Sequence, residues 1–147
     1  MVRPATLLDS RRIWEIRNDP SSRIYSHDSE IIPFEHHNAW YSEKYFQSNR
    51  NKCYVVVEDG YVIGYCRIDL SGDIYLVSIG IDRAYRNRGY GYLLLSAAIK
   101  GRQKLVAYIF KNNLASQQLF KKVGFRATKE TEEEIVFECS SLPSSGH

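Results

Sequence analysis

Residues 85–91, with the sequence YRNRGYG, place two arginines and two glycines between a strand-like and a helix-like run of apolar residues. The first turn of a helix carries unpaired backbone N–H groups and the positive end of the helix dipole, so a loop at this point can bind an anion. Gly89 and Gly91 let a ligand approach the backbone closely. Arg86 and Arg88 add positive charge. The segment therefore predicts phosphate binding by main-chain amides.

The spacing of these glycines excludes the common nucleotide-binding loops. The sequence has no GxxxxGK[ST] segment, and a GxGxxG loop would need a glycine at the position that Leu94 occupies. The segment reads instead as R-x-x-G-x-G, from Arg86 to Gly91. Taken alone, this pattern also fits a simple loop at the start of a helix, with solvated arginines.

A second motif, NNLASQQLFKKVGF, occupies residues 112–125 after the next predicted strand. It resembles the signature N-x-x-[AS]-x-x-x-[YF]-x-K-x-G-F of the GCN5-related N-acetyltransferases, the GNAT family. The matching residues are Asn113, Ser116, Phe120, Lys122, Gly124 and Phe125. Together with residues 79–95, the resemblance covers residues 52–127 and places two motifs in the order that the family has.

The resemblance implies acetyl-CoA as the acetyl donor, and no metal. In this family the glycine loop holds the pyrophosphate of the donor, while the preceding strand and the following helix contact its pantetheine arm. The residues carried over to these roles are Ile79, Ile81, Arg86, Asn87, Arg88, Gly89, Tyr90, Gly91, Asn113, Ser116 and Phe120. The reaction implied is direct attack of a primary amine on the thioester in a ternary complex, in which positioning dominates.

The acid and the base of this reaction stay open at the sequence level. Many relatives have a tyrosine as acid at the position of Phe120, which has no hydroxyl. Either another tyrosine, such as Tyr75 or Tyr90, reaches the sulfur, or the thiolate leaves unassisted, as a thiol pKa of about 8.5 permits. Residues 74–81 lack the strand carboxylate that many relatives use as base. The candidate bases are Asp69, Asp73, His27 and His37, and the predicted catalytic set is Asp73, Tyr75 and His37.

The acceptor is suggested by a further resemblance in residues 16–20 (IRNDP) and 30–45. These segments look like those of the branch that acetylates amino sugars carried on UDP, including enzymes of pseudaminic acid (flagellin sugar) synthesis. Arg17 and Asn18 could bind a diphosphate or sugar hydroxyls, and Trp40 could stack on uracil or a sugar. The alternatives are packing roles for these residues, a protein N-terminus, lysine or polyamine as acceptor, and a noncatalytic CoA-binding domain.

Periodicity and turn residues predict the elements that position these motifs. The predicted strands cover residues 2–5, 53–58, 61–69, 73–81, 104–110 and 132–139, and the predicted helices start at Asp9 and Pro33 and cover 89–100 and 113–124. Asp59-Gly60 predicts a tight hairpin, Pro20 ends the first helix and Gly124 closes the last. The nearly continuous apolar strand at 73–81 predicts burial on both faces.

The inward residues and the architecture follow from the same pattern. The residues expected to point inward are Ile13, Trp14, Ile16, Phe34, His37, Tyr41, Tyr45, Leu93, Leu94, Ala97 and Ala98. The order β-α-α-β-β-β-α-β-α-β predicts an α/β (α+β mixed) fold, with a mixed sheet and helices on both faces. The resemblance further implies a sheet that splays between the fourth and fifth strands.

Length and composition set the remaining expectations. A chain of 147 residues with 44% hydrophobic residues predicts one domain, residues 1–139, followed by a flexible tail at 140–147. The sequence shows neither a membrane-length apolar run nor a secretory signal, which predicts a cytoplasmic protein with no membrane partner. A net charge of +3 without a basic run suits a small anionic ligand and not nucleic acid.

The cysteines and the last strand complete the sequence-based expectations. Three cysteines without metal-ligand spacing predict reduced thiols. A covalent acyl-cysteine route through Cys53 or Cys66 is disfavoured, because neither has a histidine nearby in the sequence. The last predicted strand, at the end of the sheet, could pair with a second copy to give a homodimer.

Overall fold

The computed structural model describes residues 1–25 and 30–141, which contain one seven-stranded sheet in the order β1-β2-β3-β4-β5-β7-β6. The strands are β1 (Val2–Pro4), β2 (Lys52–Glu58), β3 (Tyr61–Ser71), β4 (Ile74–Ile81), β5 (Gln103–Phe110), β6 (Arg126–Glu130) and β7 (Glu134–Ser141). The helices are α1 (Ser10–Asn18), α2 (Pro20–Arg23), α3 (Phe34–Phe46), α4 (Tyr90–Ala98) and α5 (Leu114–Val123), with 3-10 turns η1 (Leu7–Asp9) and η2 (Arg83–Tyr85). The predicted α/β fold with a mixed sheet is confirmed.

Two short elements were not predicted. Helix α2 is a single turn that starts at Pro20, and the side chain of Asp19 caps it by accepting a hydrogen bond from the N–H of Ser21 at 2.8 Å. Strand β6 has the sequence RATKE, and all five of its residues are exposed. Neither element has an apolar period, because neither buries a face. Residues 142–147 of the predicted tail lie outside the described residues.

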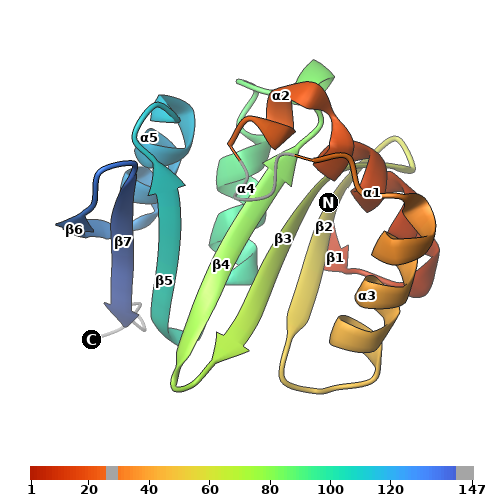
Figure 1. Cartoon of the computed structure of the whole chain (residues 1–147), viewed down its shortest axis with the longest axis horizontal. Helices are drawn as coiled ribbons and strands as arrows, with labels where there is room; N and C mark the ends of the chain where they lie inside the picture. The colour runs from red at the N-terminus through yellow and green to blue at the C-terminus, as the bar shows by residue number, and fades with distance from the viewer. Residues whose placement is uncertain (26–29, 142–147) are drawn as a thin grey trace.

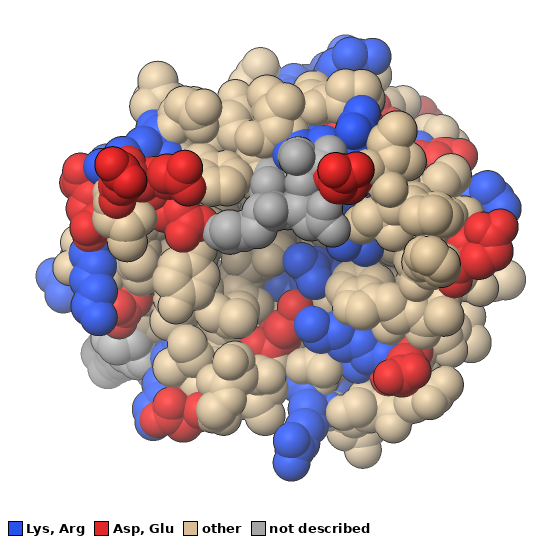
Figure 2. All heavy atoms as spheres, viewed as in Figure 1, with Lys and Arg blue, Asp and Glu red and all other residues tan. Residues whose placement is uncertain are grey.

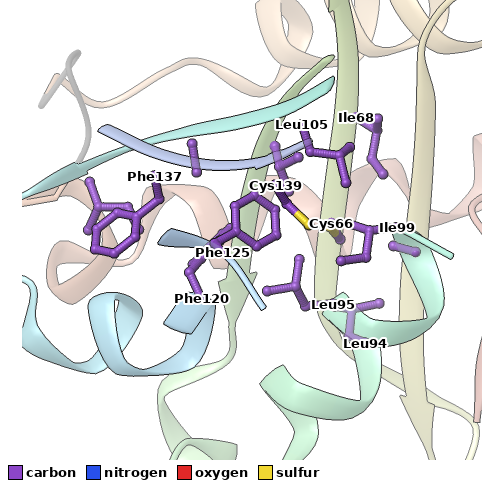
Figure 3. Close-up of a cluster of buried hydrophobic side chains, with 14 of the residues drawn as sticks. Cys66, Ile68, Leu94, Leu95, Ile99, Leu105, Phe120, Phe125, Phe137 and Cys139 are labelled. Atoms are coloured by element: carbon purple, nitrogen blue, oxygen red, sulfur yellow. The ribbon is translucent and has the colours of Figure 1, made fainter. Parts of the chain in front are cut away.

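Helices cover both faces of the sheet, as predicted (Figure 1). Neighbouring residues of β2 enter different cores: Val55 belongs to the buried cluster that includes residues of α1 and α3, whereas Val56 belongs to the cluster that includes residues of α4 and α5. Figure 3 shows the core on the α4 and α5 side, where Leu94, Leu95 and Phe120 lie against residues of the sheet.

Most local predictions for the first half of the chain are confirmed. Asp59 and Gly60 have φ angles of 53° and 76° in the β2–β3 turn, and α1 ends at Asn18, ahead of Pro20. The buried residues of α3 are those expected: His37, Tyr41 and Tyr45. Asp9 does precede α1, but its carboxylate accepts hydrogen bonds from Arg3 at 2.8 Å and from the N–H of Thr6 at 2.7 Å, and so anchors the preceding turn.

The residues predicted to pack on α4 are only half confirmed as buried. Leu94, Leu95, Ala98 and Ile99 are buried, whereas Leu93 is 46% exposed and Ala97 is also exposed. Three consecutive leucines give two helical stripes that are equally apolar, so the sequence alone could not choose between them.

The predicted burial of β4 on both faces is also wrong, because only Val77 of this strand is buried. Strand β4 pairs with β3 along all of its residues, but its parallel register with β5 consists of Tyr75–Leu105 and Leu76–Val106. Beyond these pairs the two strands separate, as the lower and upper halves of Figure 1 show, which confirms the predicted splay. Residues 77–81 of β4 therefore have one open edge. Within residues 1–25 and 30–141, none of the helices is long and apolar enough to cross a bilayer.

Candidate active site

A cleft of about 930 Å³ opens where β4 and β5 separate. Its walls come from β3, β4, β5, the loop before α4, the start of α5 and the segment around α1 and α2. Figure 2 shows a hollow on this face, with basic and acidic atoms gathered in and around it. The cleft thus joins an open strand edge to a charged surface.

The glycine loop forms one end of the cleft. Gly89 precedes α4 with φ of 89°, and Asn87 also has a positive φ, of 63°. A Cβ atom at Gly89 would meet no protein atom within 4 Å, so the backbone here borders open space. Gly89 has no side chain to cap the helix, and the first amides of α4 are therefore available to an anion.

The two arginines of the loop have different environments. Arg86 lines the cleft and is held there, because its Nε donates to the carbonyl of Ile81 at 3.0 Å and its Nη2 to Ser22 Oγ at 3.1 Å. Arg88 instead lies over the ring of Tyr85, with 5.5 Å between its Cζ and the ring centroid. Tyr90 packs against the same ring, and the side chains of Arg88 and Tyr90 are not part of the cleft wall.

The other predicted donor-binding residues meet at this cleft. They are Ile79, Ile81, Asn87, Gly89, Gly91, Asn113, Ser116 and Phe120. Asn113 caps α5, since its Oδ1 accepts a hydrogen bond from the N–H of Ser116 at 3.3 Å. Phe120 is 2% exposed and packs edge-on against Phe125, so it closes the cleft from the side of the core.

The three predicted catalytic residues are not brought together. The side chain of Asp73 is 84% exposed and pairs with Lys104 at 3.4 Å, at the end of β4 away from the glycine loop. Tyr75 packs into the core on the α4 side of the sheet, and His37 is buried on the opposite side. None of these three lines the cleft. Of the other candidate bases, Asp69 does line it, and His27 lies outside the described residues.

His37 acts on the cleft indirectly, through Arg17. Its Nδ1 lies 3.0 Å from Nη1 of Arg17. Because a guanidinium can only donate, Nδ1 must accept and the imidazole must be neutral. Burial, reinforced by the charge of Arg17, lowers the pKa of His37 from its ordinary 6.5 to about 4. The imidazole therefore holds Arg17 in place as long as it stays unprotonated.

This arrangement predicts a pH-dependent stability. Between pH 6.5 and pH 4 the unfolded chain binds a proton at His37 that the folded chain does not, so stability falls as the pH falls through this window. By pH 5 the loss should be about 2 kcal/mol relative to pH 7. Urea unfolding of wild type and His37→Asn, which keeps an acceptor near Nδ1 but does not titrate, should give diverging stabilities over this range. Parallel pH profiles of the two proteins would contradict the assignment.

The predicted acceptor residues are only partly brought to the cleft. Arg17 lines it, whereas Asn18 is engaged with Ile32, donating to its carbonyl at 3.0 Å and accepting from its N–H at 2.9 Å. Trp40 does not line the cleft and instead supports arginines: its ring centroid lies 4.4 Å from Cζ of Arg17 and 5.2 Å from Cζ of Arg67.

Three polar residues of β3 were not singled out together from the sequence. Tyr65, Arg67 and Asp69 alternate with apolar residues and share one face of the strand, which lines the cleft. Asp69 is 8% exposed and accepts hydrogen bonds from Tyr45 at 2.7 Å and from Arg67 at 3.2 Å. The Nζ of Lys44 lies 3.4 Å from the same carboxylate. The signal in the sequence was that polar residues occupy every second position, 65, 67 and 69, of an otherwise apolar strand.

Arg17, Lys44 and Arg67 form what we call the basic cluster of the cleft. Asp69 is the one carboxylate among the described residues that line the cleft, so positive charge dominates this end. The cluster comes from α1, α3 and β3, which are far apart in the sequence. Such a group can bind a carboxylate or a phosphate.

Thiol and metal chemistry find no support in the described part of the chain. Cys53 and Cys66 are buried and do not line the cleft, and burial raises the pKa of Cys53 to about 12. A thiol of this kind is a poor nucleophile. Within the described ranges, no group of three or more His, Cys, Asp or Glu residues is placed to hold a metal ion.

Comparisons with known proteins agree with this geometry. The model of the acetyltransferase (GNAT) family matches residues 11–125. An L-2,4-diaminobutyric acid acetyltransferase from Streptomyces coelicolor is 26% identical over 151 residues, which cover 95% of this chain and 82% of the relative.

Solved structures show the same fold. A phosphinothricin acetyltransferase of the GNAT superfamily from Sinorhizobium meliloti, in complex with acetyl-CoA, superimposes with a TM-score of 0.80 at 18% identity, covering 99% of this chain and 94% of that one. A ribosomal-protein-alanine N-acetyltransferase from Brucella melitensis gives a TM-score of 0.83 at 18% identity, covering 96% and 99%.

Proposed function

Because the chain belongs to the acetyltransferase (GNAT) family, we propose that it transfers the acetyl group of acetyl-CoA to the primary amine of a small acceptor that also carries a carboxylate. The observation that supports this acceptor is the basic cluster, which faces the same cleft as the glycine loop. The relative named for L-2,4-diaminobutyric acid, an amine with a carboxylate, supports the same class.

The donor side of the cleft suits acetyl-CoA. The open amides before α4 and the fixed guanidinium of Arg86 would hold its pyrophosphate, and the open edge of β4 around Ile79 and Ile81 would hold its pantetheine arm. Acetyl-CoA supplies the activated acetyl thioester. The protein supplies orientation and main-chain donors for the oxyanion that develops on the carbonyl.

The spacing along β3 sets the geometry of the acceptor. Tyr65 pairs with Gly80 and Arg67 with Ser78, so Arg67 lies one strand repeat, about 7 Å, from Tyr65 on the same face. An acceptor whose carboxylate binds at Arg67 would place an amine that lies several bonds away next to β4 near Gly80, the partner of Tyr65. This suits a side-chain amine of an amino acid better than an amine next to the carboxylate.

Among the described residues, Asp69 is the candidate base from the sequence that lines the cleft. Its carboxylate is already engaged by Tyr45, Arg67 and Lys44. We assign it to balancing and orienting the basic cluster. The described residues that line the cleft include no imidazole and no second carboxylate. The acceptor ammonium therefore gives its proton to water in the open cleft and reacts as the neutral amine.

A UDP-linked amino sugar is the acceptor that the sequence predicts. The basic cluster could also bind a diphosphate, but the ring of Trp40, which was predicted to stack on uracil or a sugar, is already in contact with Arg17 and Arg67.

Release of CoA thiol should be measured with 2,4-diaminobutyrate, its decarboxylated analogue 1,3-diaminopropane, UDP-amino sugars, polyamines and N-terminal peptides.

We expect a kcat/KM for 2,4-diaminobutyrate that exceeds that of 1,3-diaminopropane at least about tenfold. A preference for sugar nucleotides or peptides would overturn the acceptor class. Tight acetyl-CoA binding without thiol release from any acceptor would favour a noncatalytic CoA-binding domain.

A further inference from the structure

Tyr65 of β3 has an unusual position in the cleft. Its side chain is only 8% exposed, yet it forms part of the cleft wall. The ring lies across Gly80, its partner on β4, so closely that a Cβ atom at Gly80 would be 2.6 Å from Cε1 and 3.0 Å from the phenolic oxygen. The hydroxyl is therefore held next to the part of β4 whose other edge is open.

The hydroxyl of Tyr65 has no hydrogen-bond partner among the described residues. This oxygen is not among the fully enclosed polar atoms of the described residues that lack a partner, so it reaches the open cleft, where it can donate to a bound ligand. The other tyrosines that line the cleft are less buried: Tyr25, Tyr92 and Tyr108 are 38%, 43% and 48% exposed, and Tyr85 is partly buried. Phe120 has no hydroxyl. Tyr65 is thus the buried tyrosine among the described residues that line the cleft, and its hydroxyl is available to a ligand.

We propose that Tyr65 donates a hydrogen bond to the thioester sulfur as the carbon–sulfur bond breaks, which makes it a catalytic residue of the transfer. The inference rests on the function proposed above. Main-chain amides at the open edge of β4 can donate to the carbonyl oxygen, whereas a donor to the sulfur has to come from another group. The hydroxyl of Tyr65 lies beside that edge, at Gly80.

The hydroxyl of Tyr65 has a limited role in the acetyl transfer, because it donates a hydrogen bond and keeps its proton. The acceptor nitrogen bonds to the carbonyl carbon, the carbon–sulfur bond breaks, and the sulfur takes its electron pair; the extra proton of the nitrogen passes to water. Burial raises the pKa of Tyr65 above its ordinary value, whereas a free thiol has a pKa of about 8.5. The phenol therefore keeps its proton and stabilises the thiolate by hydrogen bonding, and solvent protonates the sulfur afterwards.

Binding of CoA and of desulfo-CoA, which lacks the sulfur, separates this role from simple packing. Calorimetry at about pH 9, where CoA is largely thiolate, should show that Tyr65→Phe raises the Kd of CoA about tenfold and leaves that of desulfo-CoA unchanged. In turnover, Tyr65→Phe should lower kcat about ten- to hundredfold with little change in the acceptor KM.

Tyr61→Phe is the matched control, because Tyr61 lies on the same strand, β3, but is 46% exposed and does not line the cleft. It should change neither Kd nor kcat. An equal loss of affinity for both ligands in Tyr65→Phe, or an effect confined to the acceptor KM, would overturn the sulfur contact while leaving the proposed function intact. A wild-type protein that bound neither ligand would overturn both.

Discussion

Replacing Gly89 by valine is expected to raise the Kd of acetyl-CoA about a hundredfold. Gly89 has φ of 89°, where a residue with a Cβ atom, and above all a β-branched one, is strained by about 1–2 kcal/mol. The added side chain would meet no protein atom at its Cβ but would project into the space where the phosphates must approach the amides. The strain lowers the stability of the fold, whereas the obstruction should cost roughly 3 kcal/mol of binding free energy, measurable by calorimetry.

Gly101→Val is the matched control for this substitution. Gly101 also has a positive φ, of 76°, and open space around its Cβ position, but it lies in the turn between α4 and β5, outside the cleft. The two variants should lose similar stability, while only Gly89→Val loses acetyl-CoA affinity. The acceptor KM at saturating donor should change little in either. An equal loss of affinity for acetyl-CoA and for the acceptor in Gly89→Val would count against phosphate binding by the glycine loop.

The fold could be predicted where the signal was local. The hairpin at Asp59-Gly60, the end of α1 before Pro20 and the end of α5 at Gly124 all depend on backbone angles that few residues allow. Strand β6 and the buried face of α4 could not be predicted in the same way. Their positions depend on which distant residues pack against them, and no local pattern encodes that.

The two ends of the cleft show the same contrast. The glycine loop is continuous in sequence, and the groups proposed to bind the phosphates are backbone amides, so seven residues were enough to propose this end of the cleft. The basic cluster combines α1, α3 and β3, and the register of β3 against β4 decides which side chains face the cleft. Helical spacing placed His37 and Trp40 on α3 but could not show that both support Arg17.

Replacing Arg67 by methionine is expected to raise the KM for a carboxylate-bearing acceptor about 30- to 100-fold, because a charge-assisted hydrogen bond contributes roughly 2–3 kcal/mol. Methionine keeps much of the length of the side chain and its packing on Trp40, but it removes the guanidinium. Asp69 would keep Tyr45 and Lys44 as partners, so the fold should survive with a loss of about 3 kcal/mol in unfolding free energy.

The decarboxylated acceptor tests whether this loss comes from the carboxylate. With 1,3-diaminopropane, Arg67→Met should change KM by less than about threefold, because the amine alone makes no use of the guanidinium. Arg67→Lys should recover only part of the affinity, since an ammonium restores the charge without the planar pair of donors. The Kd of acetyl-CoA should stay at its wild-type value in both variants. Equal losses with and without the carboxylate would mean that Arg67 shapes the cleft through Asp69 and does not bind the acceptor, and the acceptor class would then have to be sought at Arg17 and Lys44.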